Sequence, residues 1–350
     1  MRSANKKGDK MLTERQVLVL KAIVEEFIQT AQPVGSRVLS KKEELKFSSA
    51  TIRNEMADLE DLGFIEKTHT SSGRIPSQRG YRFYVDHIVS EEPRGIIQEV
   101  GLFEQLMTHR DSEREHAVKE AMNLLSTLTN YTSIFLGPNR DYNRVQKIQL
   151  VPISAHQGVF MIVTNQGHVE SRTITIPASI QIDEMQRIVS ALDSLLVGEY
   201  IHEIEAKLNL EFEQHLHEFI SYKEEIMYTV LQVLTQSVNQ NQYVLSGQSN
   251  LLRQPEFNDF DQAYHLINMI EEDEIIKVME RDVCGQQLMV KIGQENEIKA
   301  MENCTLISVP YRISDHEMGK IAVLGPTRME YRKIIPLLEE VAKIMSDLYK

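Results

Sequence analysis

The spacing of the apolar residues changes several times along this chain, and this constrains the fold more than any other feature. Over residues 13–128 apolar side chains recur every three to four positions, which is typical of helices. From 133 to 176 they recur every second position, as in strands. A helical block follows over about 181–271, and strand-like runs return over 287–324. Since 350 residues are too many for one ordinary core, we predict two or three domains of α+β type.

The order of strands and helices beyond residue 95 predicts one domain that is interrupted by another. We interpret residues 96–197 and 281–350 as two parts of one α/β sheet domain, and 198–280 as an inserted, mostly helical module. The strand-like runs cover 145–153, 159–163, 169–176, 287–292, 305–311 and 320–324, and the helical runs cover 181–196, 199–210, 212–240, 259–271 and 329–350.

Residues 11–90 predict a small domain of three helices and a hairpin. Thr13 and Gln16 have the spacing of a capping box at the start of the first helix. A second helix is expected over 36–45 and a third over 50–62, after which Gly63 provides a left-handed stop. Two short strands at 64–67 and 74–76 complete the layout of a winged helix-turn-helix, and a helix with Tyr81, Tyr84, Val85 and Ile88 leads out of it. Residues 91–95 are an expected linker, and residues 1–10 an expected disordered leader.

The charges are distributed unevenly between this first domain and the remainder. The whole chain carries −13, but residues 1–90 hold 15 Lys and Arg against 12 Asp and Glu, a net of +3, so the remainder carries −16. A basic head on an acidic body favours nucleic-acid contact at the head alone. A net of +3 over 90 residues is common, so this pattern is weak evidence by itself.

The third helix has two faces that predict different roles. Ile52, Met56, Leu59 and Leu62 share one face and are expected inside. The opposite face carries Ala50, Arg53, Asn54, Ala57 and Asp61. Small alanines let a helix lie close in a major groove, an arginine can bond guanine or a phosphate, and an asparagine can read adenine.

Hydroxyl and basic residues around this helix complete a predicted DNA-binding set. Hydroxyl groups at a helix N-terminus favour a phosphate, because the backbone N–H groups and the helix dipole act together there. Lys41 of the second helix is a further phosphate candidate. The predicted DNA-binding residues are Ser36, Arg37, Ser48, Ser49, Ala50, Thr51, Arg53, Asn54, Lys67, His69 and Arg74.

Other classes of function have less support in the sequence. A capped amphipathic helix is often only a solvated surface helix, and that alternative stays open on periodicity alone. His215 and His217 are two residues apart and point in different directions on a helix, so they do not suit one metal ion. Cys284 and Cys304 form no CxxC pair, which indicates structural thiols in a reduced, cytoplasmic setting. We find no catalytic set and expect no enzyme activity and no cofactor, and no apolar run reaches the roughly 18 residues of a membrane span.

Several segments resemble the HrcA family of heat-inducible transcription repressors, over about residues 11–345. The N-terminal ones include Ser48-Ser49-Ala50-Thr51-Ile52-Arg53-Asn54-Glu55-Met56 and Gly80-Tyr81-Arg82-Phe83-Tyr84-Val85-Asp86. The C-terminal ones include Ile292-Gly293-Gln294-Glu295-Asn296 and Gly325-Pro326-Thr327-Arg328-Met329-Glu330-Tyr331.

The resemblance implies an architecture and a role. It implies a winged helix, a GAF-like domain and a dimerising module inserted into the latter. It also implies a homodimer that represses chaperone operons at an inverted-repeat operator called CIRCE, that loses activity under heat, and that depends on the GroEL/GroES chaperonin. A bacterial cytoplasmic location follows from this role.

A regulator that responds to a small ligand is the main alternative for the sheet domain. GAF-like domains often hold small molecules, but no residue in the strand-like runs marks a pocket of identifiable chemistry. Thermal-shift screening against nucleotides and small metabolites would separate a sensor from a scaffold.

Overall fold

The structure is a computed structural model that describes most of the chain. The described residues are 12–68, 73–89, 97–108, 114–137, 144–165, 169–176, 181–204, 206–208, 243–281, 287–312 and 318–348. The expected leader, the linker at 91–95, the helix at 212–240, His69, Cys284 and the pair His215 and His217 lie outside these residues.

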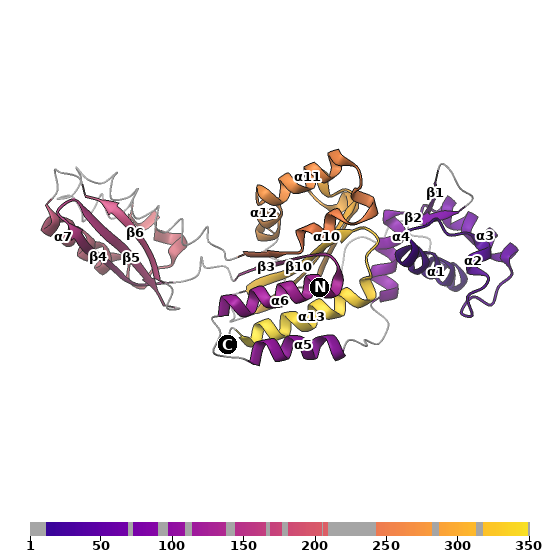
Figure 1. Cartoon of the computed structure of the whole chain (residues 1–350), viewed down its shortest axis with the longest axis horizontal. Coiled ribbons are helices and arrows are strands. Elements are labelled where there is room, and N and C mark those ends of the chain that lie inside the picture. Colours follow the sequence, from indigo (N-terminus) through magenta and orange to yellow (C-terminus); the bar gives the residue numbers. More distant parts are fainter. Residues whose placement is uncertain are drawn as a thin grey trace. The chain divides into compact units, whose positions relative to one another are not determined.

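The chain divides into two compact units, and each is described by itself (Figure 1). The first unit combines residues 1–135, 244–310 and 321–349. The second consists mainly of residues 136–243 and 311–320. The chain therefore leaves the first unit near 136, returns to it near 243, and leaves it once more for residues 311–320.

The N-terminal part of the first unit, residues 12–89, is called the head here. It contains α1 (Glu14–Thr30), α2 (Ser36–Leu39), α3 (Ser49–Asp61), a hairpin of β1 (Ile65–Lys67) and β2 (Arg74–Pro76), α4 (Gln78–Phe83) and a π-helical turn, Tyr84–Ile88. The hairpin is antiparallel, with Ile65 opposite Pro76 and Lys67 opposite Arg74. The predicted order of three helices, a hairpin and an outgoing helix is confirmed.

The start of α1 follows from its local sequence. The Thr13 side chain accepts a hydrogen bond from the backbone N–H of Gln16, and the Gln16 side chain accepts one from the N–H of Thr13. This capping box satisfies two N–H groups that the first turn leaves unpaired. The buried face of α1 centres on Leu20, Ile23 and Val24.

Helix α2 is much shorter than the expected 36–45 because its second half has no apolar face. It ends at Leu39, and the following residues form turns up to Leu45. Leu39 and Leu45 are buried, whereas the four charged residues 41–44 lie between them at the surface. Most helical stability in proteins comes from packing of an apolar face, and this segment offers none.

The remainder of the first unit is a five-stranded sheet covered by helices. Its strand order is β7 (Tyr243–Ser246), β3 (Thr132–Leu136), β10 (Met318–Pro326), β9 (Cys304–Arg312) and β8 (Met289–Ile292). Helices α5 (Ile97–Thr108), α6 (Arg114–Thr129) and α13 (Tyr331–Leu348) lie on one side of it in Figure 1. Helices α10 (Gln248–Leu252), α11 (Phe260–Glu271) and α12 (Glu274–Arg281) lie on the other.

Two strands of this sheet have no alternating pattern, and our sequence interpretation did not separate them from their surroundings. All five residues of β3 are buried, so the strand has no polar face to mark it. Strand β7 has only four residues. Short apolar runs of this kind cannot be distinguished from buried helix by periodicity.

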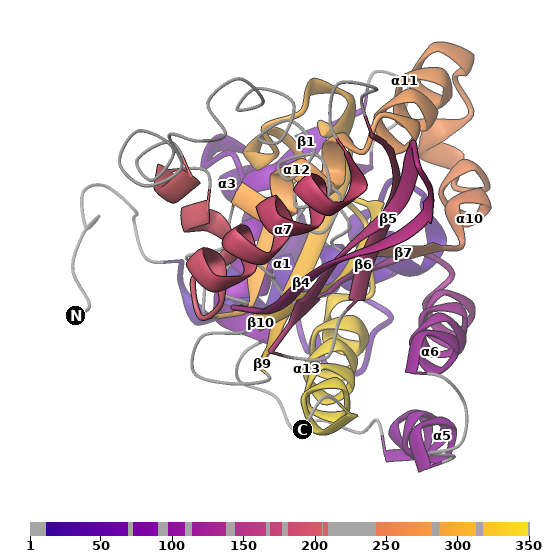
Figure 2. The same ribbon diagram turned by 90° about the vertical axis from the view of Figure 1, so that its left-hand side faces the viewer.

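The second unit has a sheet of its own. Strands β4 (Val145–Ser154), β5 (Gln157–Thr164) and β6 (Val169–Thr175) form an antiparallel meander in the order β4-β5-β6. Helix α7 (Ile182–Leu196) packs on β4, and Figure 2 shows it lying along this sheet. Its buried residues Ile188, Leu192 and Leu196 join Ile148 and Phe160 in a separate core.

The expectation that all the predicted strands belong to one sheet is therefore wrong. Among the described strands, β4–β6 pair with each other and not with the larger sheet, and β8–β10 share a sheet with β3 and β7. The expected helical module at 198–280 also differs from the observed division, because α10, α11 and α12 belong to the first unit. Within 199–210 the structure has a 3-10 turn, Ile201–Glu203, followed by helical residues at 204 and 206–208. Local spacing specifies a strand but not its partner, which is why the sequence misplaced this boundary.

None of the helices in the described parts of the chain is both long and apolar enough to cross a bilayer.

Candidate nucleic-acid interface

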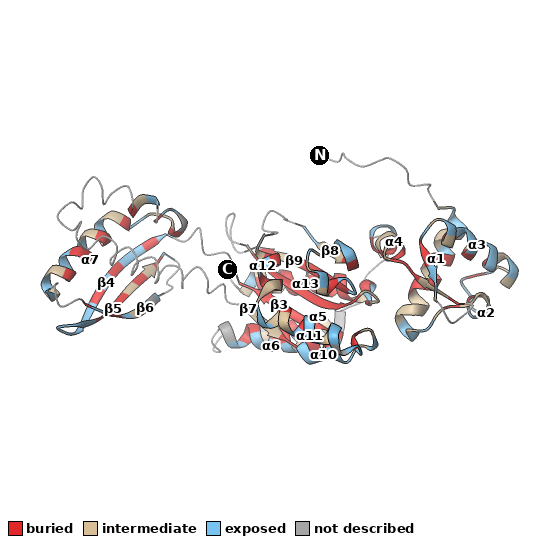
Figure 3. Ribbon diagram, turned by 90° about the horizontal axis from the view of Figure 1, so that it is seen from above, coloured by how far each residue is buried: buried red, intermediate tan, exposed pale blue. Residues whose placement is uncertain are grey.

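The two faces of α3 differ as the sequence predicts. Ile52, Met56 and Leu59 are at most 5% exposed and pack inside the head. Ala50, Arg53, Asn54 and Ala57 are exposed and are called the recognition surface here. Figure 3 shows α3 with an exposed outer side. Helix packing thus uses one face of α3 and leaves the other open.

The polar side chains of the recognition surface are not engaged within the head. Arg53 and Asn54 form no side-chain hydrogen bond or ion pair with any residue that the structure describes. The exposed alanines at 50 and 57 keep the helix surface low on either side of them. A helix face with free donors between small residues can approach the base edges in a major groove.

The N-terminus of α3 is built by three hydroxyl groups. The Ser48 hydroxyl accepts a hydrogen bond from the N–H of Thr51 at 3.1 Å and lies 2.9 Å from the Thr51 hydroxyl. Ser49 Oγ lies 3.2 Å from Ser36 Oγ, so the first turns of α2 and α3 are held together. Ser48 and Thr51 therefore act first as caps, and the helix end they expose favours an anion.

Basic residues beside this helix end extend the charged surface. Arg37 and Lys41 are exposed and have no ion pair with a described residue. Lys46, two residues before the α3 cap, has the same properties and was not among the predicted site residues. Its position next to the cap was the signal that could have identified it.

Arg74, one of the predicted DNA-binding residues at the hairpin, forms an ion pair within the head. The Nε and Nη2 atoms of Arg74 each lie 2.7 Å from Oε2 of Glu60 on α3, and the side chain is only 15% exposed. Arg74 therefore ties β2 to α3. Lys67 is 63% exposed and contacts the other Glu60 oxygen at 3.2 Å, so its ammonium stays accessible. Burial alone would raise the pKa of Glu60, but the hydrogen bonds from Arg74 and Lys67 outweigh it and lower the pKa.

A second surface of the head faces the five-stranded sheet domain and is called the docking surface here; it consists of Gln78, Tyr81, Arg82 and Tyr84. Arg82 binds both carboxylate oxygens of Glu295 and donates to the carbonyl of Val290. Gln78 accepts from the N–H of Gln294 at 3.1 Å and donates to the carbonyl of Glu302 at 3.4 Å.

A glycine permits this close approach of the head. Gly293 has φ of +56°, and a Cβ there would lie 2.2 Å from Nε2 of Gln78. Any other residue would be strained by the backbone and would displace the glutamine. Gly293, Gln294 and Glu295 belong to one of the C-terminal segments that carry the family resemblance.

Aromatic rings fill the centre of the docking surface. The ring centroids of Tyr81 and Tyr84 lie 6.1 and 6.4 Å from that of Tyr331, which begins α13. The Tyr331 hydroxyl donates to the carbonyl of Thr327 at 2.6 Å and lies 3.0 Å from the Thr305 hydroxyl. The Tyr81 hydroxyl is buried and has no hydrogen-bond partner among the described residues. Burial raises the pKa of all three tyrosines well above its ordinary value.

Ion pairs surround these rings. Arg332 lies 2.7 Å from Oε1 of Glu25 on α1, and the Tyr84 hydroxyl donates to the same oxygen at 3.3 Å. Arg328 binds Glu256 and contacts the carbonyl of Ile28 at 3.5 Å. The two C-terminal signature segments therefore meet the head.

Metal-binding clusters and thiol reactivity were the other kinds of site to consider among the described residues. They contain no group of three or more His, Cys, Asp or Glu side chains that could hold a metal ion. Cys304 is fully buried in β9, and burial raises the pKa of its thiol to about 12. A thiol with this pKa stays protonated at neutral pH and is a poor nucleophile.

Comparisons with known proteins agree with this arrangement. The matching family model is described as the HrcA protein C terminal domain and covers residues 115–335. The heat-inducible transcription repressor HrcA of Bacillus pumilus (strain SAFR-032) is 43% identical over 339 residues, which are 96% of this chain and 98% of that protein. A crystal structure described as that of a hypothetical protein at 2.2 Å resolution has a TM-score of 0.64 and 25% identity, over 97% of this chain and 99% of its own. The family model matches more than half of the chain, and the Bacillus pumilus protein matches nearly all of it. The chain therefore belongs to the HrcA family.

Proposed function

We propose that this chain represses transcription of heat-shock operons, chaperone operons among them, by binding an inverted-repeat operator of the CIRCE type as a homodimer. The observation that carries the proposal is the recognition surface of α3, whose arginine and asparagine are free while the helix itself is firmly packed. Family membership and the name of the Bacillus pumilus relative support the same role. In this reading the head is a winged helix, and α3 is the helix that enters the major groove.

The remaining DNA contacts are assigned by their place on or beside α3 and the hairpin. Arg53 and Asn54 contact base edges, and Ala50 allows the approach. Ser36, Ser49, Arg37 and Lys67 are phosphate contacts, together with the helix end that Ser48 and Thr51 cap. Arg74 keeps the hairpin in place for this contact and does not itself bind the phosphate. His69, which lies between the two strands of the hairpin in the sequence, is proposed as a phosphate contact from that position.

A dimer follows from the small size and modest charge of the head. Residues 1–90 carry a net of only +3, so one head by itself is expected to bind DNA weakly. When two heads are tethered, the second contact becomes intramolecular and total affinity rises steeply. A two-fold dimer also matches an inverted repeat. We propose that the sheet domain is GAF-like and that the second unit, inserted into it, contributes to dimerisation.

Heat release and chaperonin dependence are proposed for the same system. If the repressor is marginally stable, free GroEL/GroES maintains its folded fraction, and heat diverts the chaperonin to other unfolded proteins. Refolding yield and operator binding, measured with and without chaperonin, test this point; equal values in both conditions would contradict it.

Selection of bound sequences from random duplex DNA tests the proposed function as a whole. We expect the full-length protein to enrich a two-fold symmetric sequence, with one half-site per recognition helix. Arg53→Ala should relax the preference at one position of each half-site, because each bidentate contact reads one base. If the protein enriched no sequence and bound no duplex even at low ionic strength, the proposal would fail.

A further inference from the structure

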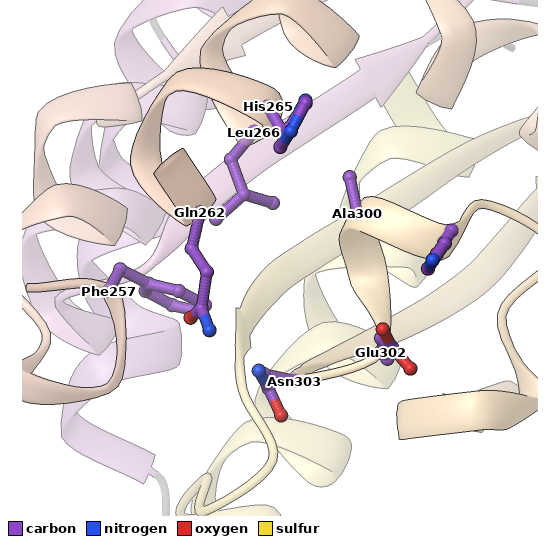
Figure 4. Close-up of a pocket in the computed structure, with 8 residues that line it drawn as sticks. Phe257, Gln262, His265, Leu266, Ala300, Glu302 and Asn303 are labelled. Atoms are coloured by element: carbon purple, nitrogen blue, oxygen red, sulfur yellow. The ribbon is translucent and has the colours of Figure 1, made fainter. Parts of the chain in front are cut away.

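A depression in the first unit has a lining that suits a small ligand. It has a volume of about 350 Å³ and lies between α11 and residues 299–303. Figure 4 shows Gln262 and Leu266 on the α11 side and Ala300, Glu302 and Asn303 on the other. Small-molecule sites have volumes of roughly 300–1,000 Å³, so this depression suits a compact metabolite.

The lining of the depression combines apolar residues with side chains of opposite charge. Phe257 and Leu266 are the apolar part on the α11 side and are at most 3% exposed as whole residues. Lys299 and Glu302 line the side opposite α11 and supply one positive and one negative charge. Gln262 and Asn303 add two amides, each of which can donate and accept.

The charged and amide side chains of the lining are not engaged with the protein. Lys299, Glu302, Gln262 and Asn303 form no side-chain hydrogen bond or ion pair with any residue in the described ranges. All four residues are exposed, so their donors and acceptors are open to a ligand from solvent. Accessible donors and acceptors beside buried apolar side chains are what a site for a polar ligand requires.

The wall that carries these charges is braced internally by one side chain. The Asn296 side chain donates to the carbonyls of Gly293, Met301 and Cys304, and so closes the segment 293–304 on itself. A wall fixed in this way loses little freedom when a ligand binds, which favours affinity.

The same wall contacts the head. The carbonyl of Glu302 accepts from Gln78, and the N–H of Gln294 donates to Gln78, so both ends of the segment meet α4. Phe257, on the apolar part of the lining, follows Glu256 in the sequence. Glu256 binds Arg328, which also contacts the carbonyl of Ile28 on α1. A ligand that moves residues 299–303 therefore changes contacts that position the head.

We propose that this depression binds a small zwitterionic metabolite with an apolar side chain, of the kind represented by L-leucine and L-phenylalanine. Lys299 binds its carboxylate, Glu302 binds its ammonium group, and the apolar side chain covers Phe257 and Leu266. Occupancy changes the docking of the head and hence operator affinity, a second step that rests on the proposed function. By thermodynamic reciprocity, operator DNA then changes the affinity for the metabolite by the same factor.

Calorimetric titration of the full-length protein tests binding with L-leucine, L-phenylalanine and two analogues of leucine. Isocaproate lacks the ammonium group and 3-methylbutylamine lacks the carboxylate. We expect saturable binding of at least one amino acid, one molecule per chain, and roughly tenfold weaker binding of both analogues, because each lacks a charge-assisted contact. Absence of saturable binding of both amino acids up to about 10 mM, far above a useful ligand concentration, overturns the proposal.

Two variants test which residue binds the carboxylate and which binds the ammonium group of the amino acid. Lys299→Met should weaken binding of the amino acid and of isocaproate and leave binding of 3-methylbutylamine unchanged. Glu302→Gln should weaken binding of the amino acid and of 3-methylbutylamine and leave binding of isocaproate unchanged. Lys343→Met, which removes a lysine that is 67% exposed on α13, is the matched control and should change none of them. If both variants bind the amino acid like the unmodified protein, the assignment of the site is wrong.

Operator binding with and without the amino acid tests the coupling. We expect the operator Kd to change on addition of the amino acid, and Gln78→Ala to abolish that change while calorimetric binding persists. If the amino acid binds and the operator Kd stays constant, the coupling is wrong and the site stands. If the protein binds no duplex at all, the proposed function fails, and calorimetry still decides the site.

Discussion

The head has two polar surfaces, and they differ in what their side chains contact. On the docking surface Gln78, Arg82 and Tyr84 bond to partners in the protein, and buried rings surround them. On the recognition surface Arg53 and Asn54 have no such partner among the described residues. Both surfaces carry arginine, so residue type alone does not separate structure from binding. The two surfaces are distinguished by whether the arginine guanidinium already binds a carboxylate of the protein.

The largest expected effect tests the recognition surface. Arg53→Ala should weaken operator binding by about 1–3 kcal/mol and relax one base position, because it removes a free bidentate donor. Thermal stability should stay unchanged, since the Arg53 side chain is exposed and forms no hydrogen bond or ion pair with a residue that the structure describes. Gel shifts and a thermal melt measure the two quantities, and Arg253→Ala on the exposed end of α10 is the control. Unchanged operator affinity would show that this arginine is only a solvated surface residue.

The docking surface is tested by two tyrosine hydroxyls that differ in their partners. Tyr331→Phe should lower the free energy of unfolding by about 1–2 kcal/mol, because it leaves the carbonyl of Thr327 without its donor. Tyr81→Phe should be neutral or stabilising, because the hydroxyl it removes is buried without a partner among the described residues. Denaturant titration compares the two variants. Equal losses from both would mean that the Tyr81 hydroxyl is bonded in solution.

Arg74 was predicted to contact DNA, but its ion pair leads us to expect an effect on stability, as for the docking surface. Arg74→Met should cost about 1 kcal/mol of stability, since it breaks a half-buried pair with Glu60. The lowered pKa of Glu60 means that this stability is present above its ordinary pKa of 4.5 and is lost as pH falls through the lower folded value. Melts of both proteins at neutral pH and near pH 3 should therefore converge at the lower pH. A flattened salt dependence of DNA binding without any loss of stability would return Arg74 to the DNA contacts.

The smallest effect is expected at Lys67. Lys67→Ala should weaken binding to all duplexes alike, by less than about 1 kcal/mol, and reduce the slope of log K against log salt by about 0.9. The exposed ammonium makes this a phosphate contact without base preference. Binding measured over a series of salt concentrations, with specific and random DNA, gives both slopes. A loss confined to the operator would contradict the assignment.

Local features of the head were predicted from the sequence with few errors. The capping box at Thr13, the serine cap of α3, the stop at Gly63 and the inward face of Ile52, Met56 and Leu59 all agree with the structure. Each depends on residues within one or two helical turns of each other. The length of α2 was wrong because its end depends on what packs against residues 41–44.

In the candidate site too, features set by neighbouring residues were predictable, and pairings between distant residues were not. Exposure of Arg53 and Asn54 follows from the helical spacing of their apolar neighbours. The pairing of Arg74 with Glu60 joins residues 14 positions apart, and that of Arg82 with Glu295 joins residues 213 positions apart, so no local pattern indicates either.

The sequence by itself determined most of the helices and strands of this protein, though not β3 and β7, and which face of α3 lies inside. The physical reason is that caps, glycine stops and apolar spacing act over neighbouring residues. Only the tertiary structure decided that β4–β6 form their own sheet, and that Gly293, Glu295 and Tyr331 meet the head. A strand offers the same hydrogen bonds to any partner, and a charged side chain pairs with whichever group the fold brings near.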